Sequence, residues 1–180
     1  MTYLLDANVF IQAHRNWYGL DFAPGFWTWL ELSGRSGQVR SLARVRGEIP
    51  GHDAVADWVV QHKGMFVDMD PVSLRRLTEV SEWVDENYVP ASVAEFLGGA
   101  DCLLVAYAKA HSMTLVTHEK PEDKKKTIKE VKLPDACRAF HVPYMNTFDM
   151  LRQEKVTLVL ATPHAGLLAP GLPGRPDRPG

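Results

Sequence analysis

The stretch Tyr3-Leu4-Leu5-Asp6-Ala7-Asn8-Val9-Phe10 decides the start of the fold. Its apolar run ends at an acid, Asp6, and a helical pattern follows. We predict a buried strand over Tyr3–Asp6 and a helix from Asn8 to about Arg15, with Asn8 as its N-cap. A strand that ends in this way places its carboxylate at the carboxyl edge of a sheet. In open α/β folds, that edge is where ligands bind.

The rest of the chain alternates between short apolar runs and amphipathic segments. Extended segments are expected at 39–41, 66–67, 114–117 and 128–131 and from residue 142. Helices are expected at 24–32, 42–48, 53–63, 71–87, 100–111, 134–140 and 147–155. In helix 71–87 the recurrence of Leu74, Leu77, Val80 and Val84 indicates one buried face. Strands that alternate with helices predict an α/β fold with a parallel sheet covered on both faces.

Length and composition indicate one folded domain followed by a tail. The chain has 180 residues, of which 46% are hydrophobic and 23% charged, as in ordinary globular proteins. From residue 161 onward, proline and glycine dominate, and such a composition cannot bury a core. We therefore expect a domain over residues 1–160 and a flexible tail over residues 161–180.

Charge and cysteine content limit the classes of function. The net charge of −2 gives no overall basic field, so any binding to nucleic acid requires a local patch. Two cysteines, Cys102 and Cys137, provide neither a disulfide framework nor a metal-binding spacing, which favours a reducing compartment. No signal peptide and no run long enough to cross a membrane is recognisable. We expect a cytoplasmic protein without a membrane partner.

Four acids stand at the boundaries of expected elements: Asp6, Glu48, Asp101 and Glu119. Singly, each has an ordinary explanation as a turn, cap or loop residue. Together they are informative, because parallel connections bring the carboxyl ends of strands to one edge of the sheet. Carboxylates that converge there repel one another unless a cation joins them. A ligand set of oxygens, without a Cys or His cluster, favours Mg²⁺ or Mn²⁺. Such an ion can activate water for attack on a phosphodiester.

At these motifs the chain resembles the PIN-domain nucleases, in particular a PIN-like subfamily of unknown function. The resemblance covers roughly residues 1–155. It is carried by Leu-Leu-Asp-Ala-Asn at 4–8, Val-Arg-Gly-Glu at 45–48, Ala-Asp-Cys-Leu-Leu-Val-Ala-Tyr-Ala at 100–108 and Leu-Val-Thr-His-Glu at 115–119. It implies a three-layer α/β/α sandwich with a central, mostly parallel sheet, and metal-dependent cleavage of RNA. Many such proteins are toxins that a cognate antitoxin protein holds inactive.

The resemblance also implies roles for individual residues. Asp6, Glu48, Asp101 and Glu119 would be the metal-binding and catalytic acids, with Asn8 and Thr117 as polar supports. The last position is more often Asp in the wider family, so Glu122 or Asp123 is an alternative fourth acid. The proline-rich tail lies outside the family pattern.

Several other side chains are candidates for contacts near the site. His118 is a possible metal ligand, but hard cations prefer oxygen, which favours a loop residue or a phosphate contact. A lysine run and nearby arginines are either a solvated charge run or a clamp for the RNA backbone. These residues are Lys124, Lys125, Lys126, Arg40, Arg44 and Arg46. Trp27 and Trp29 are expected to pack internally or to form a dimer surface, and a homodimer is our expectation.

The leading functional hypothesis is a divalent-metal-dependent endoribonuclease that acts as the toxin of a toxin–antitoxin pair. A haloacid-dehalogenase-like phosphohydrolase also begins with a strand that ends in Asp. That class requires a second Asp two residues later, where this chain has Asn8. A third reading is a degenerate PIN scaffold that binds protein; the presence of all four acids argues against it.

Overall fold

A computed structural model describes residues 1–51, 54–121 and 130–159. Within them, five strands form one sheet: β1 (Tyr3–Leu5), β2 (Val39–Leu42), β3 (Phe66–Val67), β4 (Thr114–Val116) and β5 (Tyr144–Met145). The strand order is β3-β2-β1-β4-β5, and every neighbouring pair is parallel. The predicted α/β fold with a parallel sheet is confirmed.

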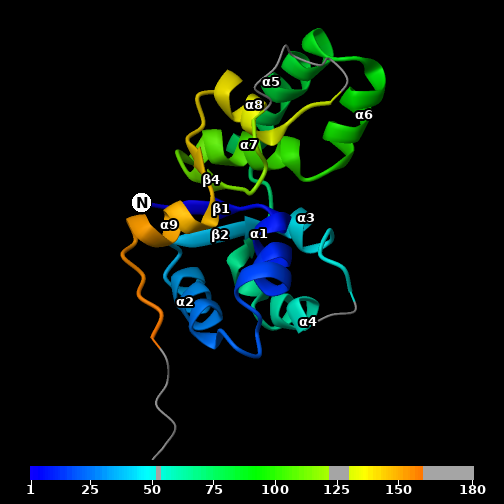
Figure 1. The fold of residues 1–180 in the computed structure, drawn as a ribbon. Coiled ribbons are helices and arrows are strands. Elements are labelled where there is room, and N and C mark those ends of the chain that lie inside the picture. Colours follow the sequence, from blue (N-terminus) through cyan, green and yellow to red (C-terminus); the bar gives the residue numbers. More distant parts are fainter. Residues whose placement is uncertain (52–53, 122–129, 160–180) are drawn as a thin grey trace, which may run out of the picture.

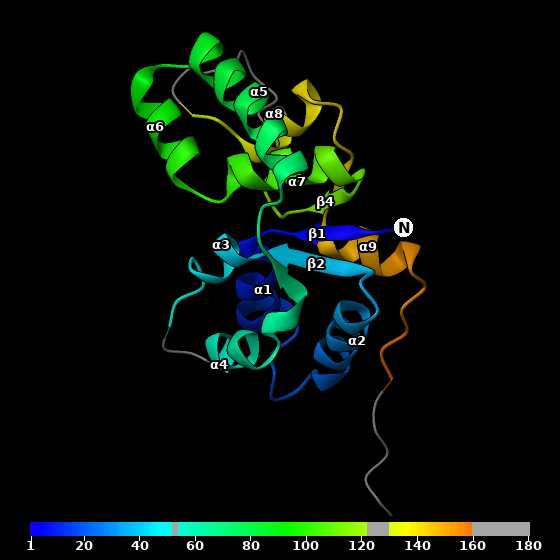
Figure 2. The same ribbon diagram turned by 180° about the vertical axis from the view of Figure 1, so that it is seen from behind.

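The helical segments lie on both faces of the sheet (Figure 1). Helices α1 (Ala7–Gln12), α2 (Pro24–Arg35) and α4 (Ala54–Gln61) lie on one face. Helices α5 (Pro71–Asn87), α6 (Pro90–Gly98), α7 (Asp101–His111) and α8 (Leu133–Ala139) lie on the other, as the reverse view in Figure 2 also shows. The remaining helical segments are a π-helical turn η1 (Ala13–Trp17), α3 (Ala43–Arg46), a 3₁₀ turn η2 (Lys63–Met65) and α9 (Thr147–Gln153). The expected three-layer sandwich is therefore present.

The order of the strands creates a switch point between β1 and β4. After β1 the chain builds β2 and β3 to one side, and it then crosses through α5, α6 and α7 to build β4 and β5 on the other. Connections that leave two adjacent strands in opposite directions open a crevice at the carboxyl ends of those strands. Asp6 follows β1 and Thr117 follows β4, so both lie at this crevice.

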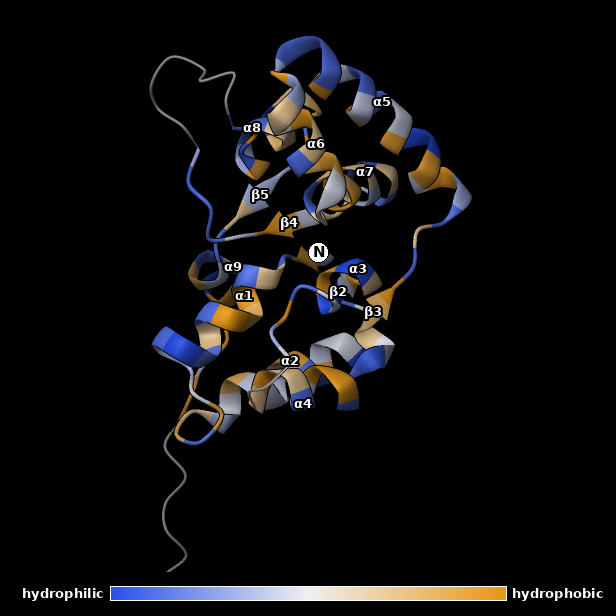
Figure 3. Cartoon of the chain, turned by 90° about the vertical axis from the view of Figure 1, so that its right-hand side faces the viewer, coloured by the Kyte–Doolittle hydropathy of each residue, from blue (hydrophilic) through white to orange (hydrophobic). Residues whose placement is uncertain are grey.

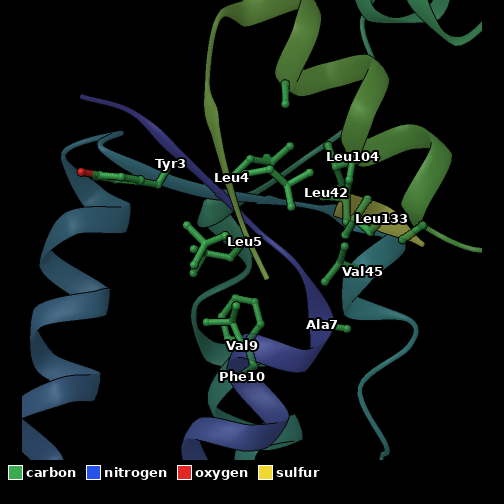
Figure 4. Close-up of a cluster of buried hydrophobic side chains, with 14 of the residues drawn as sticks. Tyr3, Leu4, Leu5, Ala7, Val9, Phe10, Leu42, Val45, Leu104 and Leu133 are labelled. Carbon is green, nitrogen blue, oxygen red and sulfur yellow. The ribbon is translucent and has the colours of Figure 1, made fainter. Parts of the chain in front are cut away.

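The core forms around β1 because its three residues are fully buried. Figure 4 shows Leu4, Leu5 and Phe10 among the packed side chains, with Leu104 of α7 and Leu133 of α8 at the right of the view. Near-continuous apolar strands are the rule in parallel sheets, since helices cover both faces. Among the described residues, no single helix is long and apolar enough to cross a membrane. The pair α6 and α7 meets that test only jointly, across a 65° bend.

Several element predictions are wrong in instructive ways. Asn8 is not an N-cap: the cap position of α1 is Asp6, and Asn8 lies inside the helix. Helix α2 continues to Arg35, into the expected loop at 33–37, and Gly37, with φ of +78°, follows its end. Helix α6 was missed altogether. The expected strand at 128–131 is not seen at residues 130 and 131, and residues 128–129 lie outside the described part.

The expected apolar face of α5 is narrower than its periodicity suggests. Val80 and Val84 are fully buried, whereas Leu77 is half-buried and Leu74 is 49% exposed. Figure 3 shows hydrophilic and hydrophobic residues alternating along this outer helix. The first turn of α5 is covered, since Ser73 is fully buried and Asp70, which caps α5, contacts His111 at the end of α7 (2.7 Å). Leu74 therefore lies beside the covered stripe of α5 and not in it.

This difference gives a stability prediction with an internal control. Leu104→Ala removes a fully buried side chain between α7 and the sheet and should lower the free energy of unfolding by about 3 kcal/mol. Leu74→Ala, at an exposed position of α5, should change it by less than about 0.5 kcal/mol. Urea unfolding followed by circular dichroism measures both. Equal losses would mean that the core is not where the structure places it.

Candidate active site

Asp6 stands at the centre of the crevice. Its backbone N–H donates to the carbonyl of Val116 (3.1 Å), which continues the β1–β4 ladder, and its side chain is only 4% exposed. Although Asp6 occupies the N-cap position of α1, its carboxylate makes no capping hydrogen bond. The carboxylate is therefore buried at the strand end without serving the helix that follows.

Thr117 positions the Asp6 carboxylate. Its hydroxyl donates to Asp6 Oδ2 (2.9 Å) and accepts from Asn8 Nδ2 (3.0 Å) and from the backbone N–H of Glu119 (3.1 Å). A hydroxyl has one donor and two acceptor positions, so these three bonds use all of them. Asn8 Oδ1 in turn accepts from the backbone N–H of His118 (3.0 Å). The expected roles of Asn8 and Thr117 as neighbours of Asp6 thus have a geometric basis.

This arrangement gives a second prediction. Thr117→Val leaves Asp6 without its donor and leaves two other donors without an acceptor, so the affinity of the expected cation site for Mn²⁺ should fall about 10- to 100-fold. Thr117→Ser keeps the hydroxyl and should retain most of that affinity. Calorimetric titration with Mn²⁺, at equal concentrations of folded protein, tests the pair. Equal affinities for the two variants would show that the hydroxyl does not position Asp6.

Two glutamates reach the site from neighbouring elements and are held by helix N-termini. Glu48, just after α3, accepts at Oε1 from the backbone N–H of Ala100, the N-cap of α7 (2.8 Å). Glu119, three residues after β4, accepts at Oε2 from the backbone N–H of Leu133, the first residue of α8 (3.0 Å). Asp101 is the first residue of α7. Four acids from four separate segments thus converge on the crevice.

The electrostatics show that these acids form one group. The pKa of Asp6 is raised to about 6, mainly by burial; the Thr117 hydroxyl opposes this rise, and the charges of Glu119 and Glu48 contribute to it. The pKa of Asp101 is raised to about 8, mainly by burial and in addition by the charges of Asp6, Glu119 and Glu48. A helix N-terminus ordinarily favours a carboxylate. At Asp101, burial and repulsion outweigh that preference, so the nearby positive charge does not balance the four acids.

The chemistry of this donor set fits a hard divalent cation, since every donor is a carboxylate oxygen. Within the described residues, however, no group of three or more His, Cys, Asp or Glu side chains is arranged to hold a metal ion as it stands. Glu48 and Glu119 are turned toward backbone N–H groups. An ion shared by three of the four acids therefore requires a glutamate side chain to turn. Asp6 and Asp101 are the strongest candidates for direct ligands.

Three further charged residues lie near the acidic site and were not predicted from the sequence. A cavity of about 120 Å³ is lined by Asp101 and Glu119 together with Glu95 of α6 and Glu130. Lys132, which pairs with Glu130, lowers the pKa of Asp101. No local motif marks these residues. Glu95 reaches the site from α6, and Glu130 and Lys132 reach it from the segment before α8. The available sequence signal was that Pro90 and Gly98-Gly99 bound a helix, α6.

The structure describes only some of the arginines and lysines that were predicted to contact RNA. Arg44 and Arg46 are exposed on α3, next to Glu48, and Arg44 donates to the carbonyl of Gly98 (2.5 Å). The suggestion for Arg40 is wrong: it lines a separate cleft of about 410 Å³ with Glu31, Arg35 and His62. The strand segment that carries Arg40 lies before the carboxyl end of β2. Lys124, Lys125, Lys126, Glu122 and Asp123 lie outside the described residues.

The remaining candidates are the tryptophans, the two cysteines and His118. Trp27 is 3% exposed, packs edge-on against Trp58 and donates from Nε1 to the carbonyl of Tyr18 (2.7 Å), so it packs within the chain and not in a dimer surface. Cys102 and Cys137 are buried and free, and burial raises the pKa of their thiols to about 11 and about 12. Burial lowers the pKa of His118, whose Nε2 lies 2.8 Å from Thr147 Oγ1.

Fold and site together define a parallel α/β protein with an acidic site at its topological switch point. The chain belongs to the family described as "Domain of unknown function (DUF4411)", whose model matches residues 3–158. No curated protein matches it. Among solved structures, it is similar to a chain of VapBC2 from Rickettsia felis, determined bound to a DNA fragment from its promoter. The identity is 14%, the TM-score is 0.49, and the match covers 81% of this chain and 98% of the other.

Proposed function

We propose that this protein is a divalent-metal-dependent endoribonuclease. The observation that carries the proposal is the convergence of Asp6, Asp101, Glu48 and Glu119 at the switch point, where burial and mutual repulsion raise the pKa of both aspartates. A group of acids that destabilise one another persists in a protein when a cation is their partner. The motif resemblance to PIN-domain nucleases supports RNA as the substrate.

Each residue of the site has a distinct part in this proposal. Bound Mg²⁺ or Mn²⁺ supplies an activated water and neutralises charge on the phosphodiester. Asp6 and Asp101 hold the ion, with Glu48 and Glu119 as further ligands or as acceptors of a proton from water. Thr117 and Asn8 keep Asp6 in place. Lys132 offsets part of the negative charge that would repel a phosphate, and Arg44 and Arg46, with Lys124, Lys125 and Lys126, attract the RNA backbone.

The proposal is tested by incubating purified protein with a mixed RNA pool in the presence of Mn²⁺, Mg²⁺ or EDTA. We expect internal cleavage with either ion, products that carry a 5′-phosphate, and no cleavage in EDTA. Cleavage that persists in EDTA would contradict the proposal. Parallel incubation with single-stranded DNA defines whether the activity extends to that substrate.

The two competing functions make different predictions. A haloacid-dehalogenase-like phosphohydrolase needs an acid at residue 8, but Asn8 there is bound to Thr117 and His118, so the protein should leave a chromogenic phosphomonoester intact. The second competing function is that of a protein-binding scaffold. The observation in its favour is that Glu48 and Glu119 already accept hydrogen bonds from backbone N–H groups. Such a scaffold requires that Mn²⁺ does not bind.

The biological role in this proposal is that of a cytoplasmic toxin controlled by an antitoxin protein, and the active form is a homodimer. The resemblance of the motifs to toxin nucleases supports the role. Growth arrest on induced expression, relieved by an inactivating substitution at Asp6, tests it. Size-exclusion chromatography with light scattering tests the homodimer.

A further inference from the structure

A second cavity lies directly beside the acidic site. Its volume is about 570 Å³, within the range of small-molecule sites. It shares Thr117 and Glu119 with the acidic site. The segment after β4, together with α1, β5 and the residues that follow each, contributes the rest of its walls. Because two residues belong to both, a ligand in this cavity lies next to any group held by the acids.

One wall of this cavity is aromatic. The ring of Trp17 lies 4.3 Å from that of His118 and 4.9 Å from that of Phe148, centroid to centroid. Tyr144 of β5 lines the cavity as well. All four rings are half-buried, so they combine a packed edge with an accessible surface. Such rings are the platforms on which unpaired nucleobases stack.

The helical backbone departs from α-helical geometry at Trp17. Residues 13–17 form a π-helical turn, in which the N–H of Tyr18 donates to the carbonyl of Ala13, five residues earlier (2.5 Å). Such turns are rare and occur often at functional sites. Continuation of α1 as an ordinary α-helix would rotate Trp17 away from its present direction. The turn is the local reason that a tryptophan on the helix after Asp6 meets His118.

Polar groups stand beside the aromatic wall. Gln12 and Asn146 both line the cavity. The amide of Asn146 is bonded at both ends to Asp149, whereas the side-chain amide of Gln12 makes no hydrogen bond to a described residue. A free amide offers a donor and an acceptor together, so Gln12 suits the edge of a base. Lys120 lines the same cavity and carries the charge that a phosphate requires. A stacking surface, an edge-reading amide and a cation are thus present in one place.

We propose that this cavity binds one unpaired base of the RNA substrate, next to the phosphodiester that the acidic site cleaves. The inference rests on the proposed function and adds to it. The substrate is single-stranded at the cut, because a paired base cannot enter the cavity, and base identity at that position influences which site is cut. A base is favoured over a protein side chain because the aromatic wall and Lys120 together match a nucleotide.

The test compares ligands that differ only in the base. Wild-type protein is titrated by NMR with each nucleoside 5′-monophosphate and with ribose 5-phosphate, in EDTA. We expect at least one monophosphate to bind about 5- to 100-fold more tightly than ribose 5-phosphate. Trp17→Leu should remove this preference. Trp29→Leu, at a half-buried tryptophan of α2 that does not line the cavity, should keep it.

A readout on the wild type covers the case in which Trp17→Leu fails to fold. Stacking of a base at this wall shifts the ring signals of His118, whereas ribose 5-phosphate leaves them in place. Equal binding of all ligands, a preference that survives Trp17→Leu, or unmoved His118 signals would overturn the inference. RNA cleavage accompanied by any of these results leaves the proposed function standing. Base-dependent binding without cleavage of any RNA refutes the proposed function and keeps the base site.

Discussion

Asp6→Asn should reduce RNA cleavage by about 10³-fold or more, because the substitution removes a charged ligand from the centre of the site and leaves its shape unchanged. The asparagine can still accept the hydrogen bond of Thr117 at its carbonyl oxygen. Loss of activity therefore reports on charge and not on local unfolding. Initial cleavage rates in Mn²⁺ measure the effect.

The same variant should be more stable than the wild type in EDTA. Asp6 is buried, and its pKa is raised to about 6, so at neutral pH the folded protein holds an unfavourable charge that asparagine does not carry. We expect the melting temperature to rise by about 5 °C. Asp57→Asn, at an exposed acid of α4, is the control and should alter neither the rate of RNA cleavage nor the melting temperature. An active Asp6→Asn enzyme would remove Asp6 from the mechanism.

The second large effect is a fall in stability of the metal-free protein as the pH rises. The pKa of Asp101 is raised to about 8 in the folded state, above its ordinary value of 3.8, so the folded state binds a proton that the unfolded state has lost. A raised acid pKa contributes stability at low pH, and that contribution disappears as the pH climbs through the folded value. Asp6 acts in the same direction up to about pH 6.

From about pH 6.5 to about pH 8, the free energy of unfolding in EDTA should therefore drop by about 2 kcal/mol. Below that window His118 works in the opposite direction, since burial lowers its pKa and its protonation destabilises the folded state. Urea unfolding at several pH values measures the drop. Asp101→Asn should flatten it. A stability that rises with pH in this window, or a variant with the wild-type slope, would contradict the coupling of the acids.

The position of Asp6 was predictable from a few residues. An apolar run that stops at an acid already specifies a strand end, and a parallel sheet brings such ends to one edge. Helix α5 was predicted within its observed bounds, since Pro71 marks its start and its apolar positions repeat at helical spacing. Both features depend on interactions within short segments of sequence, so the sequence alone is enough to predict them.

Other features depend on tertiary contacts that one sequence does not reveal. Leu74 fits the same periodic pattern as Val80, yet it is exposed while its neighbour Ser73 is fully buried, because only the packing of α5 on α7 determines which side of each turn is covered. Glu95 and Lys132 reach the site from elements that no motif connects to it. Asn8 looks like a helix cap by type, but its side chain bonds to Thr117, more than a hundred residues away.

The measurement that tests the central claim most directly is calorimetric titration of the protein with Mn²⁺ at about pH 7, in two buffers of different ionisation enthalpy. If the four acids form one cation site, Mn²⁺ binds and displaces the proton of Asp101, so the observed heat differs between buffers. Asp101→Asn should abolish that difference and weaken binding. Absence of binding, or identical titrations for wild type and variant, would show that these acids do not form a metal site.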